Sequence, residues 1–99
     1  ILLNNIASIY SSAKKYDSAL VYLNMGLAAD PGNLMIVENI AAVYYLNGNY
    51  PQAITFANKG LAIRPDSRKS YGVLMDTYNA MGNSKEGERY KKLYESMPK

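Results

Sequence analysis

The chain of 99 residues contains no cysteine, and its 48% hydrophobic and 19% charged residues are typical of a packed globular protein. The lack of cysteine excludes disulfides and thiolate metal sites, and no apolar run reaches the roughly 18 residues of a membrane-spanning helix. The net charge of +3 is the sum of +4 in residues 59–99, where nine bases are interleaved with five acids, and −1 in residues 1–58, so we expect a solvated helical surface and no nucleic-acid partner. The composition fits both a cytoplasmic and a bacterial periplasmic location, so the compartment stays open.

The first third of the chain, residues 1–33, repeats in the middle third. When Asn5 is aligned with Asn39 and the same offset is kept, eleven pairs are identical, which indicates one helical unit used twice. The first members of these pairs are Asn5, Ile6, Ala7, Tyr10, Tyr16, Ala19, Asn24, Gly26, Leu27, Ala28 and Pro31.

The chain opens on the apolar residues Ile1, Leu2 and Leu3, inside a predicted helix with no capping residue before it. We therefore expect that preceding repeats have been cut away and that the chain is a fragment of a longer one. An exposed apolar end of this kind favours self-association.

The middle unit, residues 34–67, predicts two helices joined by a tight turn. The Asn47-Gly48-Asn49 segment ends the first of these helices. The second helix runs from about residue 51 to 63 and stops before Pro65, leaving Asp66 and Ser67 to cap the next helix. The core face of the first helix has i, i+3, i+4, i+7 spacing at Val37, Ile40, Ala41 and Tyr44.

The last unit, residues 68–99, ends in a helix that is apolar on one side only. The stripe that we expect to pack consists of Tyr90, Leu93, Tyr94 and Met97, and the remaining residues from Lys85 onward are mostly charged. Such a helix is predicted to be the C-terminal cap of a repeat array.

The middle unit resembles the tetratricopeptide repeat, a helix-turn-helix unit of roughly 34 residues. The first unit resembles it too, although Lys14 stands where the turn glycine is usual. The third unit keeps Leu74, Tyr78, Gly82 and Gly87 but has Ser84 in place of the turn tyrosine and otherwise departs from the pattern. The matching positions of the middle unit are Ile40, Ala41, Tyr44, Gly48, Tyr50, Ala53, Gly60, Leu61 and Pro65.

This resemblance implies an all-α fold, a right-handed α-solenoid of three helix-turn-helix repeats with six helices. We expect one tetratricopeptide-repeat domain over residues 1–99, with repeats at 1–33, 34–67 and 68–99. The recurring tyrosines are predicted to pack the structure and not to stack on nucleic-acid bases; they are Tyr10, Tyr44 and Tyr78 on the core side and Tyr16 and Tyr50 at the turns.

The resemblance also implies that the first helices of the repeats line a concave groove that binds a peptide. Tyr45 is expected on the flank of its helix away from the second helix, and the asparagines could bond to a peptide backbone. The predicted groove residues are Asn4, Asn5, Ser8, Ser12, Met35, Glu38, Asn39, Ala42, Tyr45, Lys69, Asp76 and Asn79.

One subtype of the family clamps the C-terminal carboxylate of chaperones with lysine, asparagine and arginine. Here Asn4 and Ser8 stand at the first lysine and asparagine positions, and Ala42 and Val73 at a second asparagine and the arginine. Only Lys69 fits the pattern. We predict no carboxylate clamp, since a carboxylate needs those charge-assisted donors.

Catalytic and cofactor chemistry finds little support in the sequence. Histidine and cysteine are absent, the carboxylates are scattered, and no glycine-rich phosphate loop is present. We therefore expect no enzyme activity, no cofactor and no metal site.

The leading hypothesis is a protein–protein interaction module that binds a peptide segment of a partner protein. Two alternatives remain open: regulatory or substrate-docking repeats of a larger enzyme or sensor, and structural repeats that mediate homo-oligomerisation.

Overall fold

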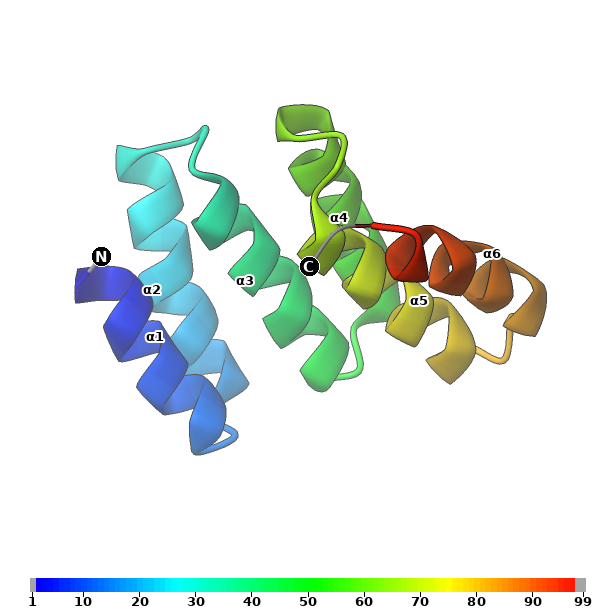
Figure 1. The fold of residues 1–99 in the computed structure, drawn as a ribbon. Helices are drawn as coiled ribbons and strands as arrows, with labels where there is room; N and C mark the ends of the chain where they lie inside the picture. Colours follow the sequence, from blue (N-terminus) through cyan, green and yellow to red (C-terminus); the bar gives the residue numbers. More distant parts are fainter. Residues whose placement is uncertain (1, 98–99) are drawn as a thin grey trace.

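The computed structural model describes the backbone of residues 2–97 and the side chains of residues 6, 7 and 9–97. Within this range the chain forms helices and no strands, so the predicted all-α solenoid is confirmed. Neighbouring helices pair as α1 with α2, α3 with α4 and α5 with α6, and the pairs stack along the chain (Figure 1). The helices are α1 (Leu2–Ser12), α2 (Tyr16–Ala29), α3 (Leu34–Leu46), α4 (Tyr50–Ile63), α5 (Arg68–Ala80) and α6 (Ser84–Glu95).

Short polar side chains start three of the helices. Asn33, Ser67 and Asn83 each accept a hydrogen bond from the backbone N–H three residues later, at 3.1, 3.2 and 3.3 Å. Each bond satisfies one of the first-turn N–H groups that a helix leaves without an internal partner. The predicted cap at Ser67 is therefore confirmed, whereas Asp66 pairs with Arg64 at 3.0 Å instead.

The turn inside each helix pair has the same backbone geometry in all three repeats. Its central residue, which is Lys14, Gly48 or Gly82, has a positive φ of 61°, 79° and 79° respectively. The N–H of the following residue then donates to the carbonyl five residues earlier at 2.8 or 2.9 Å. Lysine thus replaces glycine without changing the turn, but its Cβ raises the cost of this conformation by about 1 kcal/mol.

Two clusters of buried side chains join the three helix pairs. We call the contact of α1 and α2 with α3 the first seam and the contact of α3 and α4 with α5 the second seam. The buried residues of the first seam are on average larger than those of the second; they are Ala7, Ala19, Leu23, Ile36, Ile40 and Val43. The second seam contains Ala41, Ala53, Ala57, Val73 and Leu74. In the second seam α4 approaches α5 closely at Gly60, where a Cβ atom would collide with the Ser70 hydroxyl.

An aromatic pair joins the two helices of every repeat. The predicted packing role of Tyr10, Tyr44 and Tyr78 is confirmed, because all three are half-buried against the clusters. Each faces an aromatic ring on the second helix of its own repeat, and the two partners have the same sequence separation in every case. The pairs are Tyr10 with Tyr22 at 5.4 Å between ring centroids, Tyr44 with Phe56 at 5.7 Å and Tyr78 with Tyr90 at 5.6 Å.

Helix α6 packs on α5 by a narrower stripe than the sequence predicts. Tyr90, Tyr94 and Met97 are half-buried, but Leu93 is 36% exposed and lies beside Lys92 on the charged side. The prediction for Leu93 is therefore wrong. Because α6 contacts chiefly one neighbouring helix, the edge of its apolar stripe stays in water.

Candidate functional site

Helix α3 presents an exposed face with apolar ends and a polar centre. Met35, Asn39, Ala42 and Leu46 are spaced i, i+4, i+7, i+11, which places them on one face of the helix. Met35 is 60% exposed and Leu46 is 52% exposed, whereas Ile36, Ile40 and Val43 on the core side are buried. Each end of this face therefore offers one exposed apolar side chain to a partner.

A hollow of about 130 Å³ opens between the first two repeats beside this face. Its floor consists of residues that are almost fully buried: Ala7, Leu23 and Val43. Its rim consists of Ser11, Ser12, Asn39 and Ala42. The hollow therefore brings together two predicted groove residues, Ser12 and Asn39, from different repeats.

Asn39 also connects the second repeat to the third. The ammonium group of Lys69 on α5 donates a hydrogen bond to the Asn39 side-chain oxygen. The amide of Asn39 therefore lies where the hollow and the α5 lysine meet, and its carbonyl oxygen is already engaged by a cation.

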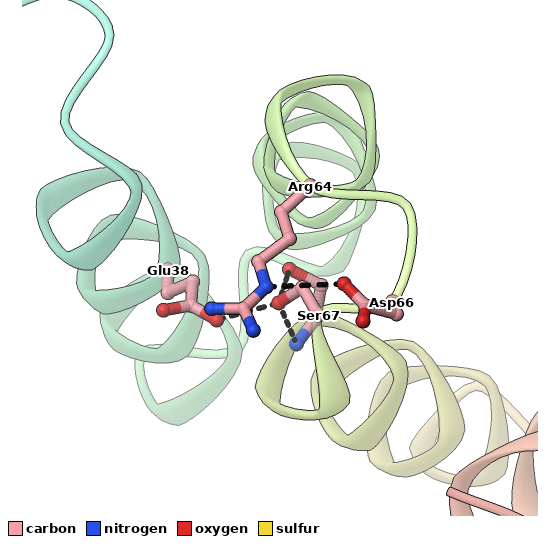
Figure 2. Close-up of polar contacts among 5 residues, drawn as sticks. Glu38, Arg64, Asp66 and Ser67 are labelled. Carbon is pink, nitrogen blue, oxygen red and sulfur yellow. Dashed lines mark hydrogen bonds and ion pairs between the residues drawn. The ribbon is translucent and has the colours of Figure 1, made fainter.

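Glu38, the neighbour of Asn39, is engaged in holding the second seam. Its carboxylate accepts a hydrogen bond from the hydroxyl of Ser67, the residue that also caps α5. Figure 2 shows this carboxylate pointing from α3 toward the turn between α4 and α5, with the Arg64–Asp66 ion pair next to it. Glu38 was predicted as a groove residue, and the bond to Ser67 gives it an additional structural role.

Tyr45 does not lie on the side of α3 away from α4. Its ring centroid is 6.1 Å from that of Tyr50 at the start of α4, and the side chain packs against the second-seam cluster. The predicted orientation is therefore wrong. Asn79, the corresponding residue of α5, likewise lies against Gly87 of α6, where a Cβ atom would collide with its amide.

Asp76 lies in the second half of α5, on the exposed side of that helix. Partial burial raises the pKa of its carboxyl above the ordinary aspartate value, because the ionised form loses hydration. This group is therefore a less favourable anion than an aspartate in open water.

The side chains of Asn4, Asn5 and Ser8, and those of Ile1, Leu2 and Leu3, lie outside the described residues. Two residues of the site were missed from the sequence, namely Ser11 at the rim of the hollow and Leu46 on the exposed face. The repeat offset carried the signal, since it pairs Leu46 with Ser12 and Ser11 with Tyr45.

Metal and membrane features are absent from residues 2–97. No three histidine, cysteine or acidic residues in that range are arranged to hold a metal ion. None of its helices has the length and apolarity needed to cross a membrane.

Several solved structures share this fold. The first tetratricopeptide domain of Spaghetti (RPAP3), bound to the HSP90 peptide SRMEEVD, has a TM-score of 0.87 at 22% identity, covering 94% of this chain and 74% of that one. Its second domain, bound to the same peptide, has a TM-score of 0.88 at 17% identity, covering 97% and 89%. A structure of MamA (MSR-1) has a TM-score of 0.83 at 22% identity, with this chain covered to 94% and spanning 53% of MamA.

At these identities the likeness concerns the fold alone, and no curated protein matches the sequence significantly. The family itself follows from a match along the sequence. A family model described as tetratricopeptide repeat matches residues 10–75, which is more than half of the chain, so the chain belongs to the tetratricopeptide repeat family.

Proposed function

We propose that the chain is a protein-interaction module whose concave face, formed by α1, α3 and α5, binds a peptide segment of a partner protein. The observation that carries the proposal is the exposed face of α3. Met35 and Leu46 are more than half exposed there, although each offers enough apolar surface to be worth burying. Membership of a repeat family that serves as an interaction scaffold supports the same conclusion.

The chemistry of this face favours a peptide with apolar side chains. The carboxylate of Glu38 is engaged by Ser67, whereas the exposed ammonium of Lys69 donates to Asn39 and keeps its charge and two further N–H donors. The side-chain amide of Asn39 carries N–H donors suited to a peptide carbonyl. Affinity would then come from burial of apolar side chains against Met35, Ala42 and Leu46.

The HSP90 peptide of the RPAP3 domains is not the ligand that we propose for this chain. Its carboxylates require a set of cationic donors, and of the clamp positions only Lys69 carries one. We expect no measurable binding of SRMEEVD by calorimetry. Binding of that peptide, abolished by Lys69→Ala, would contradict this expectation.

We infer that the module has no catalytic site of its own. Histidine and cysteine are absent from the sequence, and the described carboxylates form no cluster that could hold a metal. This inference predicts that peptides bound by the chain are recovered chemically unchanged, which mass spectrometry of the ligand after incubation tests.

The binding face is tested with peptides selected from a random phage-displayed library on the 99-residue chain. Met35→Lys should weaken a selected peptide at least about tenfold, because it places a charge where an apolar contact is proposed. Met25→Lys is the matched control, since Met25 is a similarly exposed methionine on α2, at 52%. If both variants bound the peptide as tightly as the wild-type chain does, this result would contradict the assignment of the face.

A second candidate function, self-association, is favoured by one residue of α1. Ile9 is 69% exposed, whereas the residues at the same repeat position, Val43 and Thr77, are 4% and 0% exposed. The side chain at this repeat position is therefore exposed to water on α1, whereas it is buried on α3 and α5. In a dimer, a second copy of the chain would cover Ile9. Sedimentation should then show a concentration-dependent dimer that Ile9→Lys abolishes and Val21→Lys, on exposed Val21 of α2, does not. A monomer at millimolar concentration would contradict it.

A further inference from the structure

The residues that line the hollow in the first seam have larger and smaller counterparts in the second seam. At the next repeat, Ser11 at its rim corresponds to Tyr45, and Asn39 corresponds to Val73. The ring of Tyr45 packs against the second-seam cluster, and Val73 is 8% exposed within that cluster. At the position of Ser11 the second seam therefore carries a ring, whereas at the position of Leu23 it carries the smaller Ala57.

The size of the hollow suits one aromatic ring. Its volume of about 130 Å³ is close to the roughly 150 Å³ of an engineered apolar cavity that binds benzene. The floor is apolar because it consists of alanine, leucine and valine side chains, and these residues, Ala7, Leu23 and Val43, are at most 4% exposed. The polar groups lie at the rim, at Ser11 and Asn39, where a ring substituent or the adjoining peptide backbone would meet them.

We propose that the hollow is a specificity pocket for one aromatic side chain, phenylalanine or tyrosine, of the bound peptide. This inference rests on the proposed function and adds the class of side chain that the groove selects. The ring lies beside Ser11, on the floor formed by Leu23 and Val43.

The pocket is tested directly with toluene, the small-molecule analogue of the phenylalanine side chain, in an NMR titration of the intact chain. The amide and methyl signals of Ala7, Leu23 and Val43 should shift with saturation, while those of the second seam should not. Ser11→Tyr should abolish these shifts, since it supplies the ring from the chain itself, as Tyr45 does. Ser84→Tyr, on the exposed start of α6, is the control and should leave the shifts intact.

The same variants are then applied to a peptide selected on the chain. Replacing its aromatic residue by alanine, or using Ser11→Tyr, should weaken binding about ten- to hundredfold, the effect of losing one buried aromatic side chain. The alanine-substituted peptide and the Ser11→Tyr chain each remove the same interaction, so their losses of binding free energy should not be additive when the two are combined.

Several results would overturn the pocket. If toluene shifts no NMR signal at the floor of the hollow, an aromatic site is excluded; a hollow that holds only water would give this result. The experiment uses the wild-type chain, so its result stands even where Ser11→Tyr fails to fold. A peptide that is weakened by Met35→Lys but indifferent to Ser11→Tyr overturns the pocket and leaves the proposed function intact. Toluene binding without any selectable peptide supports the preference for a ring and overturns the proposed function.

Discussion

The hydroxyl of Ser67 donates a hydrogen bond to the carboxylate of Glu38 and, through its oxygen, caps helix α5. One side chain thus starts the third repeat and ties it to the first helix of the second repeat (Figure 2). The hydroxyl oxygen of Ser70 lies 2.9 Å from the hydroxyl oxygen of Ser67, and both serines are buried. The hydrogen bond to Glu38 therefore belongs to a buried polar cluster of the second seam.

We predict that Ser67→Ala lowers the free energy of unfolding by about 2 to 3 kcal/mol, because it removes both the cap and the bond to a carboxylate. Asn33→Ala removes a cap of the same kind from α3, and the other hydrogen bond of Asn33 is a local, exposed one to Asp30. This second variant should cost about 1 kcal/mol. Urea denaturation measures both values, and equal losses would contradict the additional role of Ser67.

A double-mutant cycle separates the two contributions of Ser67. The effects of Ser67→Ala and Glu38→Ala should be less than additive, since each removes the same hydrogen bond. Strict additivity would mean that the Ser67–Glu38 bond contributes nothing in solution.

Replacing Lys14 by glycine should stabilise the chain by about 1 kcal/mol, because Lys14 has a φ of 61° that glycine adopts without a Cβ penalty. Lys15→Gly is the matched control, since Lys15 has a φ of −96° and gains nothing from glycine. Thermal unfolding followed by circular dichroism compares them. A gain from Lys15→Gly as large as that from Lys14→Gly would show that loss of positive charge, and not the backbone, is responsible.

Thr77→Val should also stabilise the chain, by about 1 kcal/mol. The Thr77 hydroxyl is buried without a hydrogen-bond partner in the described part of the chain, and the first seam has valine at the same position, Val43. Removing an unsatisfied buried hydroxyl without changing the side-chain shape recovers its desolvation cost. Thr55→Val is the control, because the exposed Thr55 hydroxyl bonds to the Pro51 carbonyl and should show no gain. A destabilised Thr77→Val chain would imply that this hydroxyl has a partner in solution.

The stability of the chain should depend on pH through Asp76. Its pKa is raised in the folded state, so folding disfavours the ionised form, and stability is lost as pH rises through the unfolded and folded pKa values. Asp76→Asn should therefore be more stable than wild type at pH 7, and the difference should vanish below about pH 3, where the wild-type carboxyl is neutral in both states. Denaturant unfolding at both pH values measures this. A difference that persists at low pH would assign the effect to packing instead of charge.

The fold was predictable because the pattern that specifies it is local and repeated. The turn geometry at Gly48, the packing of Tyr44 and the cap at Ser67 each follow from residue type and spacing within one unit. The repeat offset then extends them to the first unit, where Lys14 keeps the turn despite its side chain.

The site was only partly predictable, because the direction of a side chain at the edge of a helix face depends on neighbours from other helices. Tyr45 turns to α4, where its ring meets Tyr50, and Glu38 is drawn to Ser67 at the start of the next repeat. The hollow lies at Ser11, where the second seam has Tyr45, and this difference is found in the sequence only when repeat positions are compared by side-chain volume.

The most direct test of the proposed function is to locate a selected peptide on the chain by NMR chemical-shift mapping. The largest perturbations are predicted on α1, α3 and α5, at Ser12, Met35, Asn39, Ala42 and Lys69. Perturbations confined to the opposite side, at Val21 and Met25 of α2 and Ile63 of α4, would contradict the account.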